Sequence, residues 1–254
     1  MPKRFVEITS DFPELLLALV SAKQDPPYSI VKRESKYYLS FSDSADLRDT
    51  EKAKQSADVL LSNINGVLAL LHPSRIANGL QRTNYIITED KNGNVVGEGT
   101  REVPTTAALS IDFASMDFSS LLEMGEKASR NSRIKEAFHY CGQETSWFNL
   151  YDIYECIRKD RKEKKKKAIP SQWTKDSQGK DRLKDFIECA NNAFISGYAA
   201  RHSPADSTEI NRISDTQVIL KQGNVKIDVM TLNQAEEFIK NLMVQWLKDR
   251  GNHF

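Results

Sequence analysis

An arginine lies close to a histidine at two places in the sequence. Arg133 precedes His139 by six residues, and Arg201 directly precedes His202. An arginine can hold phosphate charge and a histidine can move a proton. Together these suffice for metal-independent RNA cleavage, because the RNA 2′-hydroxyl is itself the nucleophile. An arginine followed by a histidine after four to six intervening residues, as Arg133 is by His139, is expected by chance roughly 0.7 times in a chain of this composition. Arg133 and His139 are therefore candidate catalytic residues of a ribonuclease, and their spacing adds little weight to that hypothesis.

A second group of polar residues surrounds one of these pairs. Asn191 and Asn192 follow an apolar helical stripe, and Arg201 and His202 come ten residues later. One interpretation is a structural network in which the amides bridge helices and Arg201 pairs with Glu155, whose carboxylate accepts charged hydrogen bonds. The other interpretation is a small-molecule site built from the same cluster. Both interpretations predict that these side chains lie together.

A run of positive charge extends from residue 158 to residue 167. It holds eight basic and two acidic side chains, including Lys164, Lys165 and Lys166. A block of like charge typically forms a solvated loop. Clustered cations also neutralise phosphates, so the run could bind nucleic acid without sequence specificity. Aromatic residues that would stack on bases are not interleaved with the lysines.

Other kinds of chemistry lack sequence support. The chain has no glycine-rich phosphate loop, no Gly-x-Ser-x-Gly turn and no His-Glu-x-x-His motif, so we expect no cofactor. Cys141, Cys156 and Cys189 lack the paired spacing of a zinc site, which predicts free buried thiols and no bound metal. The longest apolar stretch, residues 15–20, is far shorter than the ~20 residues of a membrane span, and no signal peptide is evident. We therefore expect a cytoplasmic protein.

Residues 1–117 mix helix and strand patterns. Apolar residues between 46 and 71 alternate steps of four and three, which indicates one face of a long helix. Asn92-Gly93 between short β-type segments is typical of a hairpin. Strands are expected at 37–41, 85–87, 95–96 and 107–113. This part should form a small antiparallel sheet packed against one long helix.

Residues 118–254 show mainly helical periodicity. Four apolar stripes predict helices, and the last begins with the capping pair Thr231 and Gln234. A second hairpin is expected at 216–229. The prediction is an α+β protein in which the first part is followed by a helical bundle interrupted by this hairpin. The four stripes lie at 121–141, 147–157, 183–194 and 232–246.

Several motifs of the second part resemble a known group of bundles. They are Leu150-Tyr151-Asp152-Ile153-Tyr154-Glu155, then Ala190-Asn191 with Gly197 and Ala200-Arg201-His202, and the closing Trp246-Leu247. Over residues 119–250 the chain resembles uncharacterised bacterial proteins with HEPN-like helical bundles. Families of this type include RNA-cleaving toxins and defence effectors that commonly act as dimers, and inactive members that serve as binding modules. The 216–229 hairpin would be an insertion.

The resemblance and the polar cluster together give three functional hypotheses. The first is a bacterial interaction and dimerisation module, in a defence or toxin context and without clear catalysis. The second is a metal-independent ribonuclease whose Arg/His pair, as the resemblance implies, is Arg133 with His139 or Arg201 with His202. The third is a small-molecule binder at the cluster of Asn191, Arg201, His202 and Glu155. A homodimer is the expected assembly, with RNA or another protein as partner and no membrane.

Overall fold

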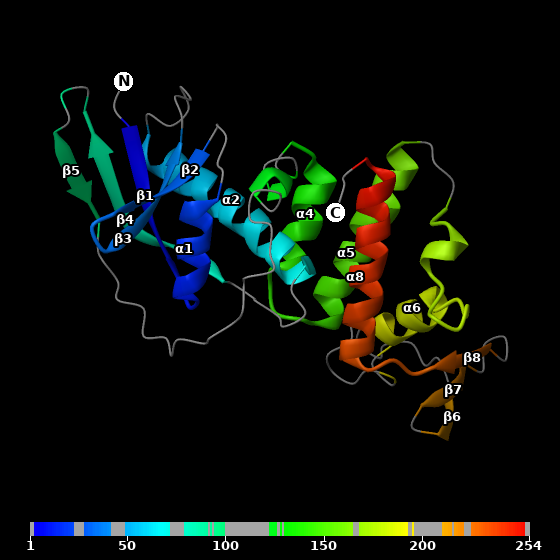
Figure 1. Cartoon of the computed structure of the whole chain (residues 1–254). Helices are drawn as coiled ribbons and strands as arrows, with labels where there is room; N and C mark the ends of the chain where they lie inside the picture. The colour runs from blue at the N-terminus through cyan, green and yellow to red at the C-terminus, as the bar shows by residue number, and fades with distance from the viewer. Residues whose placement is uncertain are drawn as a thin grey trace. The chain divides into compact units, whose positions relative to one another are not determined.

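The chain forms a mixed α+β structure with two compact units, residues Met1–Gly142 and Gln143–Phe254 (Figure 1). The predicted α+β class is confirmed. The structure, a computed structural model, describes residues 3–22, 28–41, 49–71, 79–90, 92, 94–99, 122–125, 128, 130–164, 168–192, 195, 210–214, 216–220 and 225–251.

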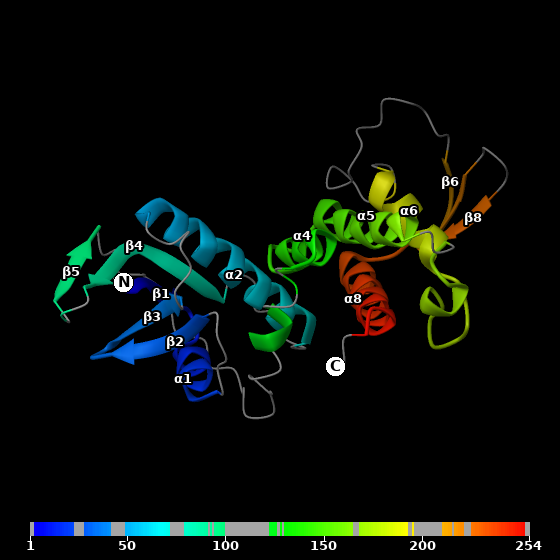
Figure 2. The same ribbon diagram turned by 90° about the horizontal axis from the view of Figure 1, so that it is seen from above.

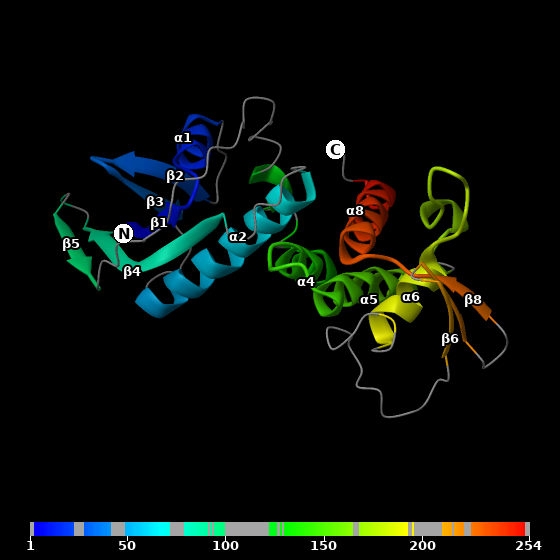
Figure 3. The same ribbon diagram turned by 90° about the horizontal axis from the view of Figure 1, so that it is seen from below.

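The first unit contains a five-stranded antiparallel sheet with the order β2-β3-β1-β4-β5. Its helices α1 (Pro13–Ser21) and α2 (Thr50–Leu71) pack on its strands, and α2 runs beside β4 (Figures 2 and 3). The buried row Val6, Leu39 and Ile86 crosses three neighbouring strands. The strands are β1 (Lys3–Ser10), β2 (Tyr28–Arg33), β3 (Lys36–Phe41), β4 (Leu80–Glu89) and β5 (Val95–Glu98).

The predicted long helix, the strand at 37–41 and the β4–β5 hairpin are confirmed. Strand β1 was not predicted, because its four consecutive residues Phe5 to Ile8 are all buried and so lack the alternation of a half-exposed strand. Strand β2 was also missed. The expected strand at 107–113 lies outside the residues that the structure describes.

Helix α4 (Ser132–Cys141) packs on α2 and belongs to the first unit. The sequence predicts a boundary at residue 117, which would group this segment with the later helices instead. The contact is close at Gly66 of α2, where an added Cβ would lie 2.2 Å from the carbonyl oxygen of Phe138. Asn131 begins α4 by accepting hydrogen bonds from the backbone N–H groups of Arg133 and Ile134, so the predicted stripe at 121–141 is not one continuous helix.

In the second unit, α5 (Trp147–Glu163) packs against α6 (Leu183–Asn191) and α8 (Leu232–Asp249). Phe186 of α6 is fully buried among aromatic rings from α5 and α8. Trp246 of α8 is also fully buried. These large side chains fill the core that the apolar stripes predicted.

The second hairpin is confirmed as β7 (Gln217–Leu220) and β8 (Val225–Asp228). A further strand, β6 (Ile210–Ser214), pairs with β7 and makes a three-stranded antiparallel sheet. Helix α8 then begins at the predicted capping box, in which Thr231 and Gln234 exchange hydrogen bonds with each other's backbone. Within the described ranges, no helix combines the length and apolar character needed to cross a bilayer.

Candidate functional site

The structure gives Arg133 and His139 different hydrogen-bond partners. Arg133 Nη1 lies 3.1 Å from Oε2 of Glu136, and His139 Nδ1 lies 2.9 Å from Oγ of Ser62 on α2. Six residues along an α-helix separate two side chains by about 120° around the axis and roughly 9 Å along it. The two side chains contact different partners, Glu136 on α4 for Arg133 and Ser62 on α2 for His139.

The other predicted pair cannot be placed, because Arg201 and His202 lie outside the residues that the structure describes. The same holds for Lys165 and Lys166. Among the predicted partners of this pair, Asn191 is the last residue of α6 and Asn192 follows it. The Asn191 Oδ1 atom is buried and accepts no hydrogen bond within the described ranges.

The Glu155 carboxylate is already engaged on its own helix. Its Oε1 and Oε2 atoms accept hydrogen bonds from Nε and Nη2 of Arg158 at 2.8 and 2.7 Å. The Lys159 ammonium lies 4.0 Å from Oε2. This bidentate pair uses the geometry that suits guanidinium and carboxylate, and the predicted pairing of Glu155 with Arg201 involves a residue outside the described part of the chain.

The basic run begins on a helix rather than in the loop that its composition suggested. Residues 158–163 form the last turns of α5, and Lys164 is its C-cap. Arg161 is buried, donates to Asp249 at 3.1 Å and stacks its guanidinium 4.6 Å from the ring centre of Trp173. Part of the run therefore stabilises the unit instead of facing a partner.

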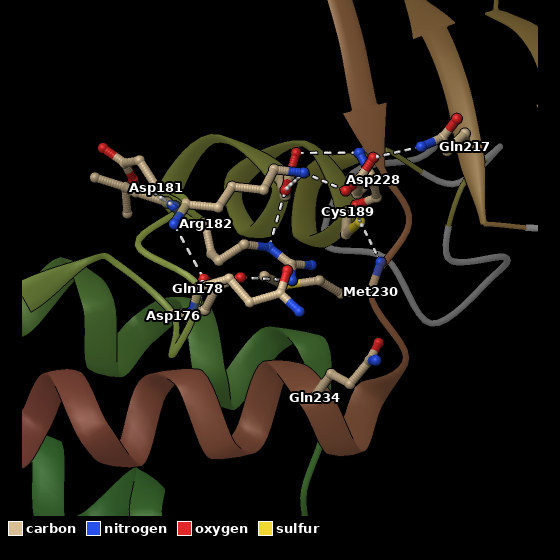
Figure 4. A network of polar contacts seen from close by, with 12 residues as sticks. Asp176, Gln178, Asp181, Arg182, Cys189, Gln217, Asp228, Met230 and Gln234 are labelled. Carbon is tan, nitrogen blue, oxygen red and sulfur yellow. Dashed lines mark hydrogen bonds and ion pairs between the residues drawn. The ribbon is translucent and has the colours of Figure 1, made fainter.

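The sequence analysis missed a charged network around Lys180 (Figure 4). The Lys180 ammonium contacts the carboxylates of Asp185, at 3.4 Å, and Asp228. Arg182 Nε donates to Asp185 at 3.0 Å, and its Nη1 lies 3.5 Å from Asp176. We call these five residues the Lys180 network. They come from the loop before α6, from α6 and from β8.

Three groups of the Lys180 network have pKa values shifted in favour of their charged forms. The hydrogen bond from Lys180 lowers the pKa of Asp228, and the backbone N–H of Lys180 lowers the pKa of Asp176. The pKa of Lys180 is raised, chiefly by its hydrogen bond to Asp228. A lysine stabilised as an ammonium is a poor nucleophile and proton acceptor. The network has a structural role, because the Asp228 backbone N–H also donates to Asp185 at 3.1 Å and so links β8 to α6.

The cysteines are free and buried, as predicted. Cys189 accepts a hydrogen bond from the backbone N–H of Met230 at 3.3 Å, and burial raises the pKa of its thiol to about 11. At neutral pH this thiol is protonated and unsuited to nucleophilic attack. Within the described ranges no group of three or more histidine, cysteine or carboxylate side chains is arranged to hold a metal ion.

Comparison of the chain with protein-family models, with curated proteins and with solved structures gave no match in any of the three.

No pattern in the sequence predicts the Lys180 network. Asp176 and Asp228 are 52 residues apart, on a loop and on a strand, and no periodic pattern joins them.

Proposed function

We propose that this protein is an interaction module without clear catalysis and that it acts as a homodimer. The observation that carries the proposal is the separate engagement of Arg133 with Glu136 and of His139 with Ser62. RNA cleavage needs the arginine and the histidine of a pair at one substrate phosphate, and in the pair that the structure describes each side chain contacts a different partner. The setting that we propose is the bacterial cytoplasm, in a defence or toxin system.

The surface that best supports self-association is the end of the first unit's sheet. In the described part of the chain β5 is an edge strand, and its Val95 and Val96 side chains are 54% and 59% exposed. An edge strand offers unpaired backbone groups to another strand, and exposed apolar residues on it add burial when a partner docks. We therefore propose that two copies pair through β5.

Incubation of the purified protein with total RNA in EDTA tests the non-catalytic part of the proposal. The wild type, His139→Ala and His202→Ala should all leave the RNA intact. Cleavage by the wild type that one substitution abolishes, in a variant that melts like the wild type, would instead establish a metal-independent ribonuclease and identify its histidine.

Light scattering coupled to gel filtration tests the dimer. The wild type should elute with the mass of two chains. Val96→Lys should lower this mass toward that of one chain, because a lysine buried between two paired β5 strands is unfavourable. Leu17→Lys is the matched control, since Leu17 of α1 is 48% exposed and lies away from β5. A wild type that stays monomeric at every concentration, or a Val96→Lys variant that stays dimeric, contradicts the proposal.

A further inference from the structure

One exposed side of α5 combines an aromatic residue with a cluster of cations. Phe148, Glu155, Arg158, Lys159 and Lys162 fall within one helical stripe, because seven residues complete nearly two turns. Phe148 is 51% exposed, and the Arg158 and Lys159 side chains are 53% and 49% exposed. Lys162 is exposed as well. We call these five residues the α5 stripe.

Glu155 orients the cationic end of the α5 stripe. Its carboxylate is 13% exposed and receives two hydrogen bonds from Arg158, which also raise the pKa of the Arg158 guanidinium. Fixing a guanidinium in advance reduces the entropy lost when an anion binds to it. With three cations and one carboxylate the α5 stripe has a net charge of +2, or +1 when Asp152 on the same side of α5 is counted, and among the described residues the Arg158 N–H groups beyond those donated to Glu155 can donate to a partner.

The spacing along the helix limits the kind of partner. The cations lie 10 to 14 residues after Phe148, which is about 15 to 21 Å along the axis. Asp152, half-buried, lies between them on the same side of α5. A nucleic acid carries a phosphate at every step, so a strand running from Phe148 to Lys162 would place a phosphate near the Asp152 carboxylate. A peptide can present an uncharged side chain at that point and carboxylates only where the cations lie.

We propose that the α5 stripe docks an acidic segment of a partner protein. An apolar side chain of that segment packs on Phe148, and its carboxylates pair with Arg158, Lys159 and Lys162. An extended segment spans this distance with about five or six residues. The inference rests on the proposed interaction role and assigns it a surface and a partner chemistry separate from the dimer contact at β5.

Fluorescence anisotropy on the full-length protein tests the docking surface. The probe is a labelled peptide with a Leu-Phe pair, a short Gly-Ser spacer and a run of glutamates, and its control has glutamine at every glutamate. We expect the acidic peptide to bind at least about tenfold more tightly than the glutamine peptide, and its binding to weaken as salt is added. Lys159→Glu with Lys162→Glu should weaken binding by at least about tenfold, and Phe148→Ser should weaken it independently of salt.

Lys184→Glu is the matched control, because Lys184 is an exposed lysine on α6 outside the α5 stripe. It should leave binding unchanged, and all variants should melt like the wild type. The inference is overturned if the acidic peptide does not bind, if the double variant binds it as well as the wild type, or if a labelled single-stranded RNA binds more tightly than the peptide. Any of these results leaves the dimer measured with Val96→Lys intact, so the two proposals fail separately.

Discussion

Asn63 places an amide in the interior of the first unit. Its side chain is 1% exposed, and neither Oδ1 nor Nδ2 has a hydrogen-bond partner within the described ranges. Because an unpaired buried polar group costs about 1–3 kcal/mol, Asn63→Leu should raise the free energy of unfolding by that order in urea denaturation. Asn65 is the matched control: it exchanges two 2.8 Å hydrogen bonds with the Leu80 backbone, so Asn65→Leu should lower stability. A destabilised Asn63→Leu variant would mean that the Asn63 amide is paired.

At the scale of elements, the Lys180 network should make the attachment of β8 to α6 sensitive to acid. The pKa values of Asp176 and Asp228 are lowered by folding, so their contribution is complete above the unfolded value of about 3.9 and is lost as pH falls through the lower folded values. The melting temperature, followed by circular dichroism, should therefore fall as the pH drops below about 4. Asp228→Asn should melt lower at pH 7 and lose less on acidification, whereas Glu188→Gln on α6 should keep the wild-type profile. If the melting temperature of Asp228→Asn falls with pH in parallel with that of the wild type, the Lys180 network does not contribute to the acid sensitivity.

At the scale of the whole molecule, the two compact units should unfold separately. Trp147, Trp173 and Trp246 all lie in the second unit, so tryptophan fluorescence reports on that unit while far-ultraviolet circular dichroism reports on both. Leu15→Ala in α1 removes a fully buried side chain, which typically costs about 2–5 kcal/mol, and should lower a transition seen by circular dichroism without moving the fluorescence transition. Leu242→Ala in α8 should move the fluorescence transition. If Leu15→Ala shifted both probes equally, the units would unfold together.

The sequence by itself determined the elements that depend on residues close together in the chain. The apolar spacing of α2, the β4–β5 hairpin and the capping box at Thr231 each depend on residues within a few positions of one another, and the structure contains the helix, the antiparallel β4–β5 pair and the capping box. The buried free cysteines also followed from residue type and spacing.

Only the tertiary structure decided what those elements contact. The packing of α4 on α2 at Gly66 depends on two helices about 70 residues apart, so helical periodicity could not assign α4 to a unit. The sequence predicts that Arg161, as part of the basic run, is solvated, but in the structure it is buried against Trp173 and Asp249. Burial and pairing are set by whichever side chains the fold brings within a few ångströms, and a sequence pattern specifies which face of an element is buried without specifying which element will cover it.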